Sequence, residues 1–126
     1  MMPRNMVKIL VVDDAAFMRI VLKDILKNLG YTNIIEASDG IMAIEQYKKF
    51  KPDLVTLDVN MPKMDGIQAL KHIMSMDPKA KVVMVTAVEQ RFIVQEAIRT
   101  GAKDYIVKPF DRSMVATVIE RVLNTR

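Results

Sequence analysis

The feature that most constrains this chain is an alternation, repeated five times, between short apolar runs and longer amphipathic segments. The runs are about four to six residues long and show little polar alternation, which is typical of parallel strands covered on both faces. We predict strands at residues 7–12, 33–37, 54–57, 82–85 and 104–107. Five repeats of strand and helix indicate an α/β fold, a single doubly wound (βα)5 domain with a parallel five-stranded sheet.

The amphipathic segments carry apolar residues at helical spacing, together with start and stop signals. We expect five helices. The first follows Asp14 and stops at Gly30, the second runs from Ser38 to Phe50, and the third begins at Asp65 and ends before Pro78. The fourth ends at Gly101, and the fifth begins near Asp111. The inward-facing residues that we predict for the last two helices are Val94, Ala97, Ile98, Met114, Val118, Ile119, Val122 and Leu123.

Length and composition favour one compact unit. With 126 residues, 51% of them hydrophobic, the chain has enough for one core and too little for two ordinary domains. We therefore expect one domain over residues 1–126, with an ordered core over about residues 7–124. The absence of cysteine excludes disulfides and thiolate chemistry. No apolar run approaches the roughly 20 residues that cross a bilayer, so we expect a cytoplasmic protein without membrane insertion.

The formal charge of +4 raises the question of nucleic-acid binding. The basic residues are scattered, however, and the densest run, at 48–51, lies at an expected helix end, where cations are favourable. No aromatic residues are interleaved with basic ones to stack on bases. We therefore expect no nucleic-acid partner, and we expect a monomer.

Polar residues follow the apolar runs just where the predicted strands end. Asp13 and Asp14 follow the first run, Asp58 the third, Thr86 the fourth and Lys108 the fifth. Because the carboxyl ends of parallel strands meet at one edge of a sheet, we expect these side chains to lie together.

Three acids at one edge repel one another unless a cation joins them. Only oxygen ligands are available there, which favours Mg²⁺, with Mn²⁺ as a second choice, over zinc. Lys108 adds a positive charge and Thr86 a hydroxyl donor. Such a site suits phosphoryl transfer to an aspartate, and we predict that Asp58 becomes an aspartyl phosphate.

Four motifs together resemble the signature of CheY-like response-regulator receiver domains. The match spans essentially the whole chain, and the order and spacing of the motifs are more specific than any one of them. They are Val11-Val12-Asp13-Asp14, residues 57–66 (LDVNMPKMDG), Val85-Thr86-Ala87 and residues 105–110 (YIVKPF). The resemblance implies a flavodoxin-like fold with strand order 2-1-3-4-5.

The resemblance also implies a metal site and a phosphoryl acceptor. Asp58 is then the acceptor, Asp14 and Asp58 ligate Mg²⁺ directly, and the backbone carbonyl of Asn60 is a third protein ligand. Asp13 acts mainly through water.

Other residues gain roles from the same resemblance. Thr86 and Lys108 contact the phosphoryl group, and Tyr105 is a switch residue that turns inward on activation. The Lys108–Pro109 bond is expected to be cis, and Gly66 and Pro62 shape the loop after Asp58.

The resemblance implies a signalling protein rather than an enzyme, apart from its own phosphorylation and dephosphorylation. No residues follow the last expected helix, so we expect a stand-alone chemotaxis regulator. Its partners would be a CheA-type histidine kinase, a flagellar switch protein or archaeal motor adaptor, and a phosphatase. Alternatives are a phosphorelay intermediate, a small flavin-binding protein and a phosphatase with an aspartate nucleophile. The Asp13-Asp14-Ala15-Ala16 loop lacks the glycines that cradle phosphate, and Asn60 stands where such a phosphatase needs a second acid.

Overall fold

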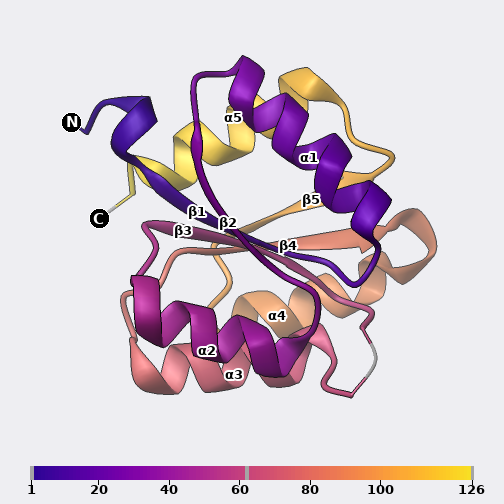
Figure 1. Cartoon of the computed structure of the whole chain (residues 1–126). Helices are drawn as coiled ribbons and strands as arrows, with labels where there is room; N and C mark the ends of the chain where they lie inside the picture. The colour runs from indigo at the N-terminus through magenta and orange to yellow at the C-terminus, as the bar shows by residue number, and fades with distance from the viewer. Residues whose placement is uncertain (1, 62, 126) are drawn as a thin grey trace.

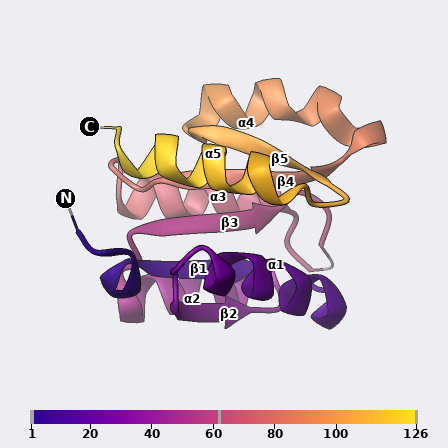
Figure 2. The same ribbon diagram turned by 90° about the horizontal axis from the view of Figure 1, so that it is seen from above.

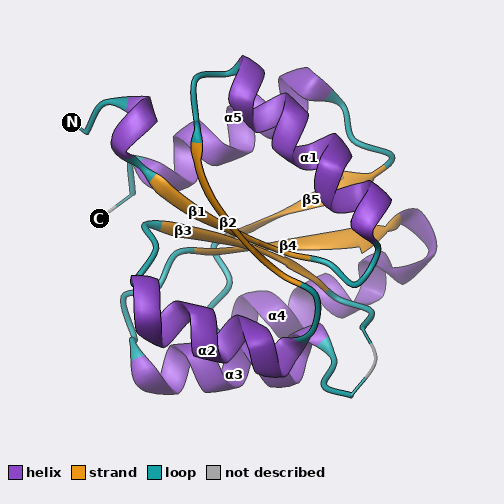
Figure 3. Ribbon diagram, viewed as in Figure 1, coloured by secondary structure: helices purple, strands orange, loops and turns teal. Residues whose placement is uncertain are grey.

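The computed structural model describes residues 2–61 and 63–125, and it has the predicted alternation of strands and helices (Figure 1; Figure 3). The strands are β1 (Lys8–Val12), β2 (Asn33–Ala37), β3 (Leu54–Asp58), β4 (Val82–Ala87) and β5 (Asp104–Lys108). The α-helices are α1 (Ala16–Asn28), α2 (Gly40–Phe50), α3 (Gly66–Met76), α4 (Val94–Thr100) and α5 (Arg112–Leu123). Short 3₁₀ helices, η1 (Arg4–Met6) and η2 (Val88–Ile93), precede β1 and α4.

The five strands form one parallel sheet in the order β2-β1-β3-β4-β5, as Figure 2 shows from above. This confirms the expected fold class and strand order. Helices α1 and α5 cover one face, and α2, α3 and α4 cover the other (Figure 1). Each face therefore has its own apolar cluster, and the carboxyl ends of all strands emerge at one edge.

Burial of the strands depends on their place in the sheet. β1, β3 and β4 are almost fully buried, as we expected of all five strands. The expectation is wrong for β2 and β5, which are the two edge strands and are only partly buried. β2 therefore accommodates a charged residue, Glu36, within its length.

Two inward-facing residues were predicted wrongly. Met114 is 55% exposed and Ile98 is 44% exposed. Helix α5 instead buries Val115, which continues the inward face formed by Val118 and Ile119 and shifts that face one position from Met114. Helix α4 covers only seven residues, because the turn before it is the 3₁₀ helix η2.

Among the described residues, none of the helices combines the length and apolar character that a membrane crossing requires.

Candidate functional site

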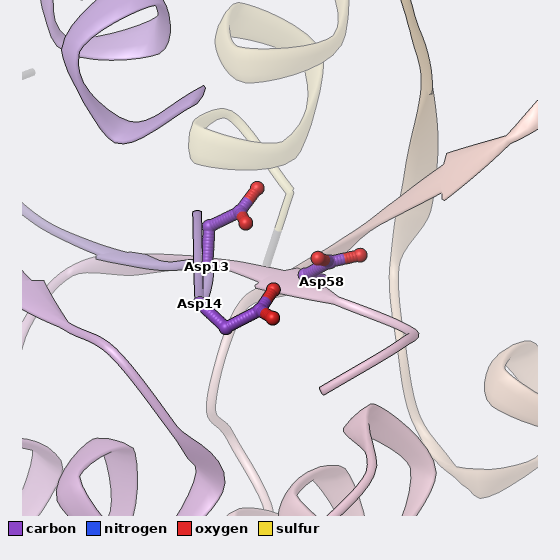
Figure 4. Close-up of side chains that lie close together, drawn as sticks. All are labelled: Asp13, Asp14 and Asp58. Atoms are coloured by element: carbon purple, nitrogen blue, oxygen red, sulfur yellow. The ribbon is translucent and has the colours of Figure 1, made fainter. Parts of the chain in front are cut away.

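Three carboxylates meet at the carboxyl edge of the sheet. Asp13 and Asp14 follow β1 directly, and Asp58 is the last residue of the neighbouring strand β3. One carboxylate oxygen from each of the three lies within 4.8 Å of the others, and Figure 4 shows the three side chains close together. Asp13 and Asp58 are only 4% and 5% exposed, whereas Asp14 is exposed. The structure thus brings together the three acids that the strand ends predicted.

Lys108 reaches two of these acids from the end of β5. Its Nζ lies 2.8 Å from Asp13 Oδ2 and 3.4 Å from Asp58 Oδ2. The peptide bond that follows, Lys108–Pro109, is cis. The ammonium group joins the ends of β1 and β3, although β4 lies between β3 and β5 in the sheet. One cation therefore serves two buried carboxylates.

The charges at this edge are not balanced. Burial, and then the nearby charge of Asp13, raise the pKa of Asp58 to about 6, although Lys108 and the Asn60 amide oppose the rise. Burial alone would lower the pKa of Lys108, but its hydrogen bond to Asp13 and the charges of Asp58 and Asp13 outweigh it and raise that pKa. The site therefore has a surplus of negative charge that a further cation would relieve.

The donor set fits a hard divalent cation. All three side chains offer carboxylate oxygens, and the cluster contains neither histidine nor cysteine. Mg²⁺ prefers such oxygen ligands and commonly takes only one or two carboxylates, keeping other positions for water and phosphate oxygens. Mn²⁺ accepts the same ligands.

Backbone contacts hold the acids in place. Asp13 Oδ1 accepts a hydrogen bond from the Ala15 amide at 2.9 Å, and the Asp13 carbonyl accepts one from Arg19 Nη1 at 2.7 Å. Asp58 Oδ1 accepts one from the Asn60 amide at 3.3 Å. Asn60 itself is exposed and lies two residues after Asp58. That its backbone carbonyl is a metal ligand stays a prediction.

Gly66 sets the distance between α3 and the end of β3. Its amide donates to the Val59 carbonyl at 2.9 Å. A Cβ atom at this position would lie 2.7 Å from Val59 Cα and would collide with the Asp58 carbonyl oxygen. The predicted role of Gly66 in shaping this loop thus has a physical basis in a close backbone approach. Pro62, which was given a similar role, lies outside the described residues.

Thr86 and Tyr105 lie in β4 and β5, and their side chains have other partners than the acids. The Thr86 hydroxyl is fully buried and donates to the Ala87 carbonyl at 3.0 Å rather than to Asp58. We predicted that Thr86 follows the fourth strand. This is wrong, because β4 extends through Ala87 and Thr86 lies within it. Tyr105 pairs with Met84 in the sheet and packs partly buried against the core. Their roles in switching stay predictions.

Sequence reasoning missed an ion cluster beside the acids. Glu36 of β2 accepts hydrogen bonds from Arg19 Nε at 3.0 Å and Lys23 Nζ at 2.9 Å. The bond from Lys23, together with that from Arg19, holds the pKa of Glu36 below its usual value. The available signal was an acid inside an otherwise apolar run, with two basic residues four positions apart on the preceding helix.

The chain belongs to the response regulator receiver domain family, whose model matches residues 9–120. Among proteins it is similar to are chemotaxis proteins CheY. The one from Thermotoga maritima is 51% identical over 91% of this chain and 96% of its own length. The one from Bacillus subtilis is 50% identical over 93% of this chain and 98% of its own.

Solved structures agree with this assignment. CheY in the CheX-CheY-BeF3-Mg²⁺ complex from Borrelia burgdorferi has a TM-score of 0.89 and 39% identity, over 94% of this chain and 90% of that one. The receiver domain of NtrX from Brucella abortus also has a TM-score of 0.89, with 34% identity over 94% and 99% of the two chains. Receiver domains are signalling domains rather than metabolic enzymes, and they bind Mg²⁺ at an acidic site.

Proposed function

We propose that this chain is a chemotaxis response regulator that accepts a phosphoryl group on Asp58 in the presence of Mg²⁺. One observation supports this most directly: two buried carboxylates, Asp13 and Asp58, share a single lysine at the carboxyl edge of the sheet, beside the exposed Asp14. The similarity to CheY over nearly the full chain supports the chemotaxis assignment. The same similarity favours it over the flavin-binding and phosphatase alternatives.

In the proposed reaction a carboxylate oxygen of Asp58 attacks the phosphorus atom of the donor. The bond between phosphorus and the leaving group breaks, and its electron pair departs with that group. Asp14, Asp58 and the Asn60 carbonyl would hold Mg²⁺ directly, and Asp13 would act mainly through water. The ion would supply positive charge that offsets negative charge on the phosphoryl oxygens. Lys108, already 3.4 Å from Asp58 Oδ2, stabilises the same developing charge.

The signal then passes from the site toward α4, β5 and α5. The Thr86 hydroxyl exchanges its bond to the Ala87 carbonyl for one to the phosphoryl group, and Tyr105 turns inward. We propose that the changed surface binds a motility-motor component, that a CheA-type histidine kinase supplies the phosphoryl group, and that a phosphatase removes it. CheX, which accompanies CheY in the Borrelia burgdorferi complex, is the model for this last partner. We also propose that residues 1–126 form one receiver domain and that it acts in the cytoplasm.

The test is phosphorylation by acetyl phosphate with and without Mg²⁺, followed by intact-protein mass spectrometry. We expect the wild type to gain the mass of one phosphoryl group only when Mg²⁺ is present. Asp58→Ala should gain none, and Asp24→Asn, which removes an exposed acid of α1 outside the cluster, should behave as the wild type. Phosphorylation of Asp58→Ala at the wild-type level, or of the wild type in excess chelator, would contradict the proposal.

A further inference from the structure

The Arg19 side chain joins three segments that are separate in the sequence. From α1 it donates to the Asp13 carbonyl, 2.7 Å from Nη1, and to Glu36 Oε1, 3.0 Å from Nε. The side chain is only 18% exposed. It therefore links the end of β1 to the edge strand β2 through one guanidinium group, whose planar fork suits two partners at once.

The turn that Arg19 holds contains two of the three acids. The Asp13 amide donates to the Ala37 carbonyl at 3.1 Å, and the Asp13 carboxylate accepts the Ala15 amide at 2.9 Å. Asp14 lies between these anchored positions and is itself exposed. The Asp13 carbonyl faces the guanidinium, so this bond limits rotation of the peptide unit that connects Asp13 to Asp14.

Glu36 fixes the guanidinium from the other side. It also accepts from Lys23, and the Glu36 carbonyl accepts from Gln46 Nε2 at 3.2 Å on the opposite helix layer. Glu36 lies in an edge strand that is only partly buried, so its charged side chain reaches both solvent and its two basic partners. Lys23 shares Glu36 with Arg19, but Arg19 is the one whose side chain donates to Asp13.

We propose that Arg19 is a positioning residue, held by Glu36, that keeps the Asp13-Asp14 turn in the arrangement that binds a divalent cation. The inference rests on the proposed function, since it concerns the same cation site. Arg19 touches neither the cation nor the phosphoryl group and acts through the Asp13 backbone.

Charge and positioning give opposite predictions for the loss of Arg19. A guanidinium beside the acids repels Mg²⁺, so its removal should tighten Mg²⁺ binding if charge alone matters. If positioning dominates, removal should weaken binding, because loss of an outer hydrogen bond to a ligand residue commonly lowers metal affinity. The sign of the change therefore separates the two explanations.

The experiment compares Mg²⁺ dissociation constants, measured by calorimetry, for the wild type, Arg19→Gln, Arg19→Lys and Lys23→Gln. We expect Arg19→Gln to bind Mg²⁺ about threefold or more weakly, which is the effect of losing one ordinary hydrogen bond. Arg19→Lys keeps the charge but loses the fork, so it should also bind more weakly. Lys23→Gln, the matched control, removes the other partner of Glu36 and should bind Mg²⁺ no more weakly than the wild type.

A second measurement uses the Mg²⁺-free protein. Hydrogen exchange of the Ala15 amide, followed by NMR, should be faster in Arg19→Gln and unchanged in Lys23→Gln. Equal or tighter Mg²⁺ binding by both Arg19 variants, or equal weakening by Lys23→Gln, would overturn the positioning role. If the wild type itself binds no Mg²⁺, the proposed function fails, while the exchange of Ala15 still decides whether Arg19 holds the turn.

Discussion

The two edges of the sheet both carry acids, but they differ in how each acid is compensated. At the amino edge, three acids each accept a hydrogen bond from a different donor. The pairs are Asp53 with the Lys8 amide, Asp77 with the Tyr47 hydroxyl, and Glu120 with the Arg4 guanidinium. At the carboxyl edge, Asp13 and Asp58 share Lys108, and Asp14 lies beside them.

The amino edge also has the larger hollow, of about 880 Å³, and its lining includes Asp53, Asp77 and Glu120. A smaller cleft of about 350 Å³ lies beside Asn60, between α3 and the segment leading into α4. The larger hollow is therefore not at the edge where we propose that Asp58 is phosphorylated. The surplus of buried negative charge at the carboxyl edge is the feature that supports the proposed site, because buried charge without a partner is costly unless a ligand compensates it.

Removing the ammonium group of Lys108 should give the largest change in the free energy of unfolding. Lys108→Met leaves Asp13 and Asp58 without their shared partner, and we expect it to lower the free energy of unfolding by about 3 kcal/mol at pH 8 without divalent cations. Arg4→Met is the amino-edge counterpart. It breaks a pair whose side chains are 46% and 47% exposed, so we expect a loss of about 1 kcal/mol or less.

Urea denaturation of both variants in chelator measures this difference. Equal losses would show that the two edges are compensated alike, and the comparison on which the site rests would fail. Mg²⁺ should also reduce the stability deficit of Lys108→Met relative to the wild type, because the ion replaces positive charge lost from the acidic cluster. It should leave the deficit of Arg4→Met relative to the wild type unchanged, because the acidic cluster of that variant is intact.

The next effect concerns pH. The pKa of Asp58 is about 6 in the folded protein against an ordinary value of 3.8, so the folded state binds this proton more tightly than the unfolded one. Stability from this group is therefore present at low pH and is lost as pH rises from about 4 to about 6. Asp58→Asn removes the charge, and without metal we expect it to stabilise the protein by about 2 kcal/mol at pH 8 and by little near pH 4.

Urea denaturation across this pH range measures the gain. Asp53→Asn is the control at the amino edge, where the carboxylate already accepts the Lys8 amide at 2.8 Å, and it should gain no stability at pH 8. A gain for Asp58→Asn that does not change with pH would contradict the assignment of the repulsion to the ionised carboxylate.

The contrast between the edges also explains what could be predicted from the sequence. Buried strands are apolar along their length, so a carboxylate such as Asp58 or a pair such as Asp13-Asp14 is conspicuous at the point where a strand ends. Topology then brings the strand ends together without any knowledge of side-chain contacts. The three acids and Lys108 can be predicted in this way without any distance.

What could not be predicted depends on rotamers and on helix phase. The direction of the Thr86 hydroxyl, toward the Ala87 carbonyl, is a rotamer choice that spacing does not encode. The exposure of Met114 follows from the helix phase, which buries Val115 instead. The bridge from Arg19 to Glu36 depends on the rotamers of two long side chains, which the sequence pattern does not encode.

The smallest change in unfolding free energy is expected for a buried neutral group without a hydrogen-bond partner. This group tests whether the site depends on surplus charge or on any unpaired polar atom. Thr56 lies in β3, two residues before Asp58, and its fully buried hydroxyl has no hydrogen-bond partner among the described residues. Its sheet neighbours are Val11 and Val83, both core residues. Thr56→Val keeps the shape and removes the unpaired group, so we expect a gain of about 1 kcal/mol in unfolding free energy.

Thr86→Val is the matched control in the adjacent strand, because that hydroxyl is equally buried but donates to the Ala87 carbonyl. It should gain no stability, since the substitution leaves a carbonyl without its donor. If phosphorylation depends on the charges at the carboxyl edge and not on the unpaired hydroxyl in β3, Thr56→Val also leaves phosphorylation by acetyl phosphate unchanged. A stable Thr56→Val protein with impaired phosphorylation would instead mean that the site extends below the edge into β3, and that the acids and Lys108 are not sufficient to define it.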